Sequence, residues 1–175
     1  MAQSIAVDEI DAVLRDGTVV HIRPMHPTDA GRLVRFHHSL SPASTRLRFF
    51  TFHPELSPKE LDRFTHVDHR EREAVVALDG DDIVGVGRYD RMSGTDTAEV
   101  AFVVTDAWQG RGVGRVLFDA VAARACEAGI DQLDAVTLPD NVRMLHVLRA
   151  TGLPMRSLFE DGTVRASLQL RRSTP

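Results

Sequence analysis

The sequence has 175 residues, of which 43% are hydrophobic and 26% are charged, and its formal net charge is −4. These values are typical of a single globular domain with a core of its own, and they argue against general binding to nucleic acid or to a membrane surface. No apolar run approaches the roughly 20 residues of a membrane span. The lone cysteine, Cys126, excludes an internal disulfide. Because the N-terminus also lacks the basic segment of an export signal, we expect a cytoplasmic protein.

The N-terminal part of the chain predicts one strand followed by helices. Residues 1–14 have no clear period and predict a loose or helical tail, so we expect a single domain over residues 15–175. The alternating residues 18–23 predict the first strand. Combinations of a capping residue and a proline then predict two or three helices. These helix-start signals lie at Pro27, Ser41-Pro42 and Ser57-Pro58.

The rest of the chain predicts more strands than helices. Strands are expected at residues 73–78, 83–88, 98–104, 132–137, 155–160 and 164–170. Helices are expected at residues 112–128 and from Asn141 to about 151, and each is followed by the glycine that commonly ends a helix. A mixed sheet covered by helices, which is an α/β fold, follows from this order.

A glycine-rich turn at Gln109–Gly114 follows an apolar strand and opens a helix. Glycine lets the backbone approach a ligand closely, and the N–H groups of a first helical turn attract anions. The dinucleotide fingerprint does not fit, because its third glycine position is occupied by Arg115, and the nucleoside-triphosphate loop would need a lysine. The remaining pattern is Gln-x-x-Gly-x-Gly, and the alternative is a plain strand-to-helix turn.

This pattern resembles the acetyl-coenzyme A pyrophosphate loop of the GCN5-related N-acetyltransferase (GNAT) family. The family also has an asparagine, a short helix and a glycine after its fifth strand, which match Asn141 and Gly152 here. The resemblance covers roughly residues 15–170 and implies a mixed, mostly antiparallel sheet flanked by helices on both faces. Residues 41–50, with the pattern Ser-Pro-x-Ser-x-x-x-Arg-Phe-Phe, are similar to bacterial protein-lysine acetyltransferases that modify acyl-coenzyme A synthetases.

The resemblance implies a set of contacts with acetyl-coenzyme A (acetyl-CoA). The pyrophosphate is assigned to backbone N–H groups of Gln109, Gly110, Arg111, Gly112, Val113 and Gly114. The side chains of Arg111 and Arg115 either add charge near the phosphates or face solvent at the helix start. The pantetheine arm is expected along Phe102, Val103 and Val104, where a backbone N–H would polarise the thioester carbonyl. Asn141 either contacts the arm or caps its own helix.

Glu99 is the candidate general base. A lysine amine has a pKa of about 10.4, so a base must remove its proton before acyl transfer at neutral pH. Glu99 is the only ionisable residue in the apolar run 98–104, where we expect a raised pKa, and the resembled group has its general base at this position. The alternative is a glutamate on a solvated face or edge of the sheet.

The family's proton donor to the leaving thiolate is absent from its expected position. The family often has a tyrosine there, and Leu148 occupies it, while the lone tyrosine, Tyr89, ends the third strand. Direct transfer in a ternary complex is expected, because Cys126 has no partner histidine in the sequence pattern. His66 and His69 lie in a charged loop, where histidines are usually solvated, and no metal is expected.

The acceptor remains open at this point. A protein lysine is favoured, and a small amine such as an amino acid, a polyamine or an antibiotic is the alternative within the same enzyme class. A non-catalytic coenzyme A sensor is a third possibility, which an intact Glu99 disfavours. Neither the oligomeric state nor any regulator follows from the sequence.

Overall fold

The computed structural model describes residues 9–170 of the chain. Its strands are β1 (Ile10–Val13), β2 (Val19–Pro24), β3 (Arg72–Asp79), β4 (Asp82–Arg91), β5 (Thr97–Val104), β6 (Gln132–Thr137), β7 (Met155–Glu160) and β8 (Thr163–Gln169). Its helices are η1 (Pro27–Asp29), α1 (Ala30–Ser39), α2 (Pro42–Phe49), α3 (Pro58–Thr65), η2 (Asp106–Trp108), α4 (Val113–Glu127) and α5 (Val142–Ala150).

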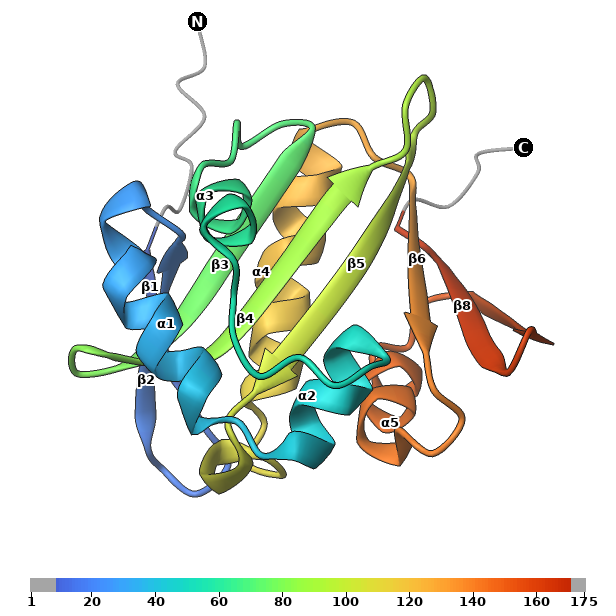
Figure 1. The fold of residues 1–175 in the computed structure, drawn as a ribbon. Coiled ribbons are helices and arrows are strands. Elements are labelled where there is room, and N and C mark those ends of the chain that lie inside the picture. The colour runs from blue at the N-terminus through green and yellow to red at the C-terminus, as the bar shows by residue number, and fades with distance from the viewer. Residues whose placement is uncertain (1–8, 171–175) are drawn as a thin grey trace, which may run out of the picture.

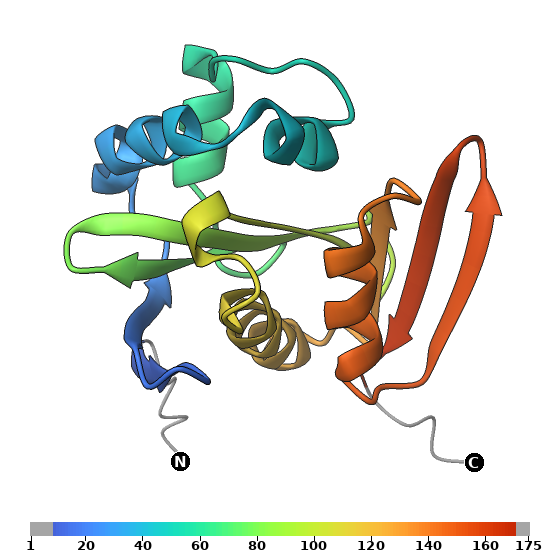
Figure 2. The ribbon, with the colours of Figure 1, turned by 90° about the horizontal axis from the view of Figure 1, so that it is seen from below.

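The strands of the described part form one eight-stranded sheet in the order β1-β2-β3-β4-β5-β6-β8-β7 (Figure 1). Every neighbouring pair is antiparallel except β5 and β6, which run parallel. Helices α1, α2 and α3 cover one face of the sheet, and α4 covers the other (Figure 2). The predicted mixed, mostly antiparallel sheet with helices on both faces is therefore confirmed.

One element differs from the sequence-based prediction. Residues 10–13 were expected in a loose or helical tail, but they form the edge strand β1 and pair with β2 from Ile10↔Ile22 to Val13↔Val19. Ile10 and Val13 are both exposed and only the small Ala12 packs against the core, so the strand lacks a clear alternation of buried and exposed residues. Pairing with β2 supplies its order instead. The first eight residues of the predicted tail lie outside the described residues.

Two cores lie on the two faces of the sheet. Leu117, Phe118 and Val121 of α4 pack in one core, and Leu33 and Phe36 of α1 pack in the other. Side chains alternate between the faces along a strand. In β5, the buried residues Ala98, Val100 and Phe102 join the α4 core. Glu99, Ala101 and Val103 therefore lie on the opposite face, beneath α1, α2 and α3.

The two parallel strands separate half-way along their length. β5 pairs with β6 only from Thr97↔Gln132 to Val100↔Ala135. Further on, residues 101–104 of β5 remain paired with β4, and the end of β6 remains paired with β8. Figure 1 shows the two strands close at one end and apart at the other, with α5 near the open end. The edge of residues 101–104 is thus left without a neighbouring strand.

A buried ion pair fixes the start of the helical layer. The Asp29 side chain has 0% exposure, and its carboxylate accepts two hydrogen bonds from Arg23, at 2.7 and 2.8 Å. The carboxylate also accepts a hydrogen bond from the backbone N–H of His26 at 2.8 Å, and His26 is the N-cap of η1. Burial alone would raise the pKa of Asp29, but the bonds from Arg23 and His26 outweigh it and lower that pKa.

We expect Asp29→Asn to lower the free energy of unfolding by about 3 kcal/mol, because it leaves the Arg23 guanidinium without its anionic partner. A carboxylate with a lowered folded-state pKa stabilises the fold above its unfolded pKa of about 3.9, and this contribution is lost as the pH falls through the folded pKa. The difference between wild type and variant should therefore narrow below about pH 4. Urea denaturation from pH 3 to 7 measures both effects.

Asp81→Asn is the matched control, because the Asp81 side chain is 93% exposed and, within residues 9–170, pairs only with Arg32, at 3.1 Å. Its removal should leave the free energy of unfolding nearly unchanged. Equal losses for the two variants would contradict a special role for the buried pair.

Candidate active site

A cleft of about 670 Å³ opens where β5 and β6 separate. Its walls come from the end of β5, the turn before α4, and the helices α2, α4 and α5. Nine of the predicted contact residues line it, namely Phe102, Val103, Val104, Gln109, Gly110, Gly112, Gly114, Arg115 and Asn141. The volume is that of a site for a metabolite or a large part of a cofactor.

The glycine-rich turn forms one end of this cleft. Gly110 and Gly112 have φ angles of +75° and +104°, a conformation that other residues rarely adopt, and a Cβ at either position would meet no atom within 4 Å. In the described part of the chain, no side chain caps the start of α4. The first N–H groups of a helix have no partner inside it, so the turn offers them to an anion in the cleft.

Two polar side chains of the cleft lining are held by hydrogen bonds within the protein. The side-chain amide of Gln109 donates to the carbonyl of Val104 at 2.9 Å and to Ser44 Oγ at 3.0 Å, and its oxygen accepts from Arg143. Asn141 Oδ1 accepts from the backbone N–H of Met144 at 3.2 Å, which caps α5. Gln109 thus holds β5, α2 and α5 together. Asn141 is a helix cap, and its contact with a ligand remains a prediction.

The structure places two predicted residues away from the cleft lining. The Arg111 side chain bonds to Asp16 at 2.8 Å and to Thr18 at 2.7 Å, and its guanidinium lies 4.0 Å from the centre of the Trp108 ring. Val113 is 1% exposed and packs in the α4 core. Their predicted contributions are therefore limited to their backbone N–H groups. Arg115 does line the cleft, and it pairs with Asp119 at 2.9 Å.

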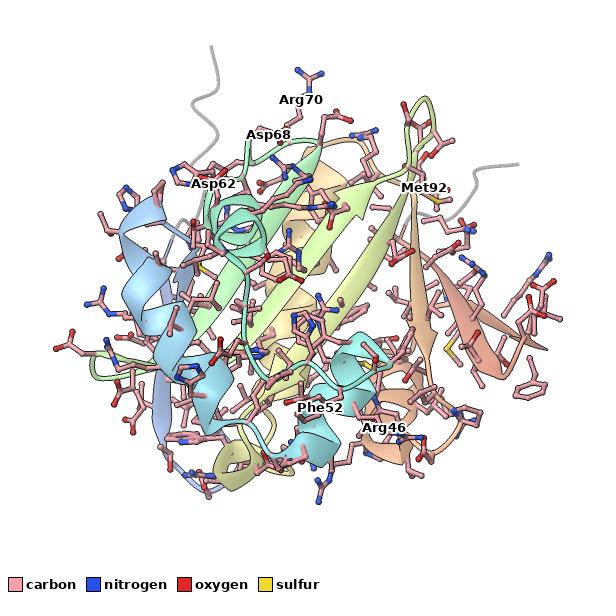
Figure 3. All side chains as sticks on the ribbon, viewed as in Figure 1. Arg46, Phe52, Asp62, Asp68, Arg70 and Met92 are labelled. Carbon is pink, nitrogen blue, oxygen red and sulfur yellow. The ribbon has the colours of Figure 1, made fainter. Side chains whose placement is uncertain are left out.

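The sequence analysis gave no role in the cleft to four basic residues that also line it, namely Arg15, Arg48, Arg143 and His146. Arg143 lies in the first turn of α5, where a cation is unfavourable for the helix dipole unless an anion is near. That signal could have identified Arg143 from the sequence. Arg46 of α2, labelled in Figure 3, instead pairs with Asp140 just before α5 at 3.0 Å. The cleft thus has cations on several sides of its glycine-rich end.

Glu99 lies on the face of β5 that carries α1, α2 and α3. Its side chain is exposed, and among the described residues it has no hydrogen bond or ion pair. Asp90 of β4 and Asp134 of β6 are its direct neighbours in the sheet register. The negative charge of Glu99 acts to raise the pKa of Arg48. Glu99 does not line the cleft itself, and its catalytic role remains a prediction.

The chain's single tyrosine lies apart from this arrangement. Tyr89 has 0% exposure in the α4 core, and its hydroxyl donates to the carbonyl of Arg70 at 3.1 Å. Burial raises its pKa, with the negative charge of Glu73 adding to the effect. Leu148, at the position expected for a catalytic tyrosine, is also fully buried. Tyr89 and Leu148 therefore provide no proton for a leaving group.

Two further candidates can be placed. Cys126 is a half-buried residue of α4 and is not part of the cleft lining. In the predicted loop, His69 bonds to Glu73 at 2.9 Å and His66 pairs with Asp62 at 3.2 Å. Within residues 9–170, no group of three His, Cys, Asp or Glu side chains is placed to hold a metal ion.

Comparison with known proteins decides the family. The family model described as an acetyltransferase (GNAT) domain matches residues 20–154. The chain belongs to the GNAT acetyltransferase family. It is therefore an acyltransferase of the N-acetyltransferase type, and the family resemblance seen in the sequence is confirmed.

Two similar proteins come from Pseudomonas aeruginosa and S. lividans. This GNAT domain is 33% identical over 154 residues to an acetyltransferase of Pseudomonas aeruginosa, covering 86% of this chain and 83% of that one. The crystal structure of the GNAT domain of S. lividans PAT superposes with a TM-score of 0.89 at 40% identity, covering 95% and 99% of the two chains.

A third relative is longer than this GNAT domain. Acetyltransferase Pat of Mycolicibacterium smegmatis is 28% identical over 149 residues, which are 83% of this chain but 44% of Pat. The chain thus spans less than half the length of that relative.

Among the described helices, none combines the length and the apolar character that crossing a membrane requires.

Proposed function

We propose that this GNAT domain transfers the acetyl group of acetyl-CoA to the side-chain amine of a protein lysine, with an acyl-CoA synthetase as the acceptor class. Members of the family use acetyl-CoA as the acyl donor. The observation that carries the donor assignment is the cleft at the separated strands, with uncapped N–H groups at its glycine-rich end. The likeness to the S. lividans PAT domain supports a protein acceptor.

The residues of the cleft suit this donor. The turn of residues 109–114 would hold the pyrophosphate through backbone N–H groups, with Arg115 and Arg143 adding positive charge nearby. The free edge of Phe102, Val103 and Val104 would pair with the amide groups of the pantetheine arm in the manner of an added strand. The same edge would direct a backbone N–H at the thioester oxygen, and such a donor stabilises developing negative charge.

On the acceptor side, Glu99 would accept a proton from the amine, directly or through a water molecule. Although α1, α2 and α3 cover this face of the sheet, Glu99 itself is exposed, which leaves it accessible to a bulky acceptor. Bound acetyl-CoA supplies the activated acyl group and a thiolate leaving group. A thiol of the cysteine type has a pKa of about 8.5, so the thiolate can take its proton from solvent. No acetylated enzyme residue is required.

The acceptor side of the sheet favours a protein over a small molecule. The cavity there is lined by Phe36, Phe49 and Phe64 and has a volume of about 40 Å³. Sites that enclose a whole small molecule are far larger, commonly ~300 Å³ or more. A side chain that projects from a protein surface needs only part of such a space.

The lone cysteine suits the cytoplasm, where we place the reaction.

Coenzyme A release from acetyl-CoA, measured with an acyl-CoA synthetase and with a panel of amino acids, polyamines and aminoglycosides, tests this proposal. The expected result is transfer to a synthetase lysine, located by mass spectrometry. With the small amines of the panel, coenzyme A release should be no faster than the spontaneous hydrolysis of acetyl-CoA. Transfer only to small amines would replace the protein acceptor by a small one. Tight acetyl-CoA binding without transfer to any acceptor would favour a sensor.

A further inference from the structure

A second, smaller cavity lies between the sheet and α1, α2 and α3, beside the cleft. Its walls combine the aromatic rings of Phe36, Phe49 and Phe64 with two arginines, Arg48 of α2 and Arg88 of β4. Arg48 lines both this cavity and the cleft. The cavity therefore adjoins the cleft along the part of β5 that contains Val103, which also lines both spaces.

Arg88 is a buried cation with an unused donor. The residue is 5% exposed, and its Nη2 atom is buried with no hydrogen-bond partner in the described part of the chain. Its Nε atom lies 3.5 Å from Asp90 Oδ2, which is long for a hydrogen bond, and Asp90 already binds Arg63 at 3.2 Å. The guanidinium also stacks over the Phe64 ring at 4.5 Å. An unsatisfied donor on a buried charge is costly, so it calls for an explanation.

Arg48 is the second arginine of the cavity, and it is half-buried. Its guanidinium lies 4.9 Å from the centre of the Phe49 ring, and among residues 9–170 it has no hydrogen bond or ion pair. Burial lowers the pKa of Arg48 to about 10, and the positive charge of Arg88 adds to this effect. Burial also lowers the pKa of Arg88. The negative charges of Asp90 and Glu99 oppose the shift at Arg48, and that of Asp90 opposes it at Arg88, but burial outweighs them. An anionic ligand in this small aromatic space would stabilise both cations further.

We propose that Arg48 and Arg88 form a carboxylate-binding subsite at the reacting end of the cleft. A guanidinium presents paired donors that match the two oxygens of a carboxylate. One water molecule needs about 10–15 Å³ by the same measure, so the 40 Å³ of the cavity fits the three heavy atoms of a carboxylate but not a larger anionic group such as a nucleotide. The aromatic walls exclude water and strengthen such a contact.

The carboxylate has two possible sources, and both rest on the proposed acyl transfer. It could be the free end of a dicarboxylic acyl group carried by the donor, as in succinyl-CoA. It could also be an acidic side chain next to the acceptor lysine. In either case the subsite adds selectivity that acetyl-CoA and a plain amine do not require.

The subsite itself is tested by titrating succinate into the protein and following the change by NMR, with no transfer reaction needed. Wild type should bind succinate, and Arg88→Met should bind it about ten-fold more weakly or not at all. Arg35→Met is the matched control, because Arg35 is an exposed arginine of α1 outside both cavities. It should bind like wild type. If Arg88→Met does not fold, Arg88→Lys keeps the charge but loses the paired donors, and it should weaken binding as well.

Two rate comparisons then identify the source. Faster transfer from succinyl-CoA than from acetyl-CoA, lost in the Arg88 variant, assigns the carboxylate to the acyl donor. Faster acetylation of a lysine peptide with glutamate next to the lysine than with glutamine, lost in the same variant, assigns it to the acceptor. Succinate binding that is absent, or equal in wild type and the Arg88 variants, overturns the subsite. Arg88-dependent succinate binding without any transfer would leave the subsite and refute the proposed function.

Discussion

Glu99→Gln should lower kcat for acetyl transfer by roughly 10²- to 10³-fold while leaving the affinity for acetyl-CoA unchanged. The amide has nearly the shape of the carboxylate but cannot accept the proton of the attacking amine. Glu99 lies outside the cleft lining and has no bonded partner among the described residues, so its replacement disturbs neither the donor site nor the fold. Initial rates with saturating acceptor, together with calorimetric titration of acetyl-CoA, separate the two quantities.

Glu127→Gln provides the control for this variant. Glu127 is an exposed glutamate at the end of α4, on the opposite face of the sheet from Glu99. Its replacement makes the same chemical change and should leave both kcat and acetyl-CoA affinity at wild-type values. Wild-type turnover in Glu99→Gln would remove Glu99 as the base and leave a water molecule or another side chain in that role.

Gly112→Ala should weaken acetyl-CoA binding by about ten-fold or more. The φ angle of +104° at this position is unfavourable for any residue with a Cβ, at a cost of about 1–3 kcal/mol. Space is not the obstacle, because the added methyl group would meet nothing within 4 Å. The strain must instead shift the turn, and with it the N–H groups that begin α4. Calorimetric titration of acetyl-CoA measures the loss.

Gly80→Ala is the matched control, since Gly80 also has a positive φ angle, +57°, with open space around its Cβ position. It lies in the turn between β3 and β4, and it does not line the cleft. Both variants should lose some thermal stability, but only Gly112→Ala should lose acetyl-CoA affinity. Equal affinities in the two variants would show that the turn of residues 109–114 does not hold the donor.

The sequence predicted most of the fold because local patterns determine most of its elements. The caps at Ser41 and Ser57 and the glycine after α4 are readable in a single sequence, and the structure contains all three. The edge strand β1 could not be predicted in the same way. Its large hydrophobic residues, Ile10 and Val13, are exposed, and the strand forms by pairing with β2, which is a tertiary contact.

In the candidate site, too, local sequence predicted some residues, whereas others are brought together only by tertiary contacts. The glycine-rich turn is contiguous in the chain, so the sequence alone is enough to identify its residues together. Arg48 and Arg88 come from a helix and a strand that are distant in the chain, and only packing brings them to one cavity. For Arg111, the motif suggested a side-chain role that the three-dimensional contacts do not support. Its place in the motif suggested a charge for the phosphates, whereas its side chain is occupied by Asp16, Thr18 and Trp108.

A crystal structure of the protein with acetyl-CoA tests the central claim most directly. We expect the pyrophosphate at the N–H groups of residues 109–114, the pantetheine arm along residues 102–104 where β5 leaves β6, and the acetyl group on the face that carries Glu99. A donor bound outside this cleft, or an acetyl group directed to the α4 face, would contradict both the binding site and the assigned base.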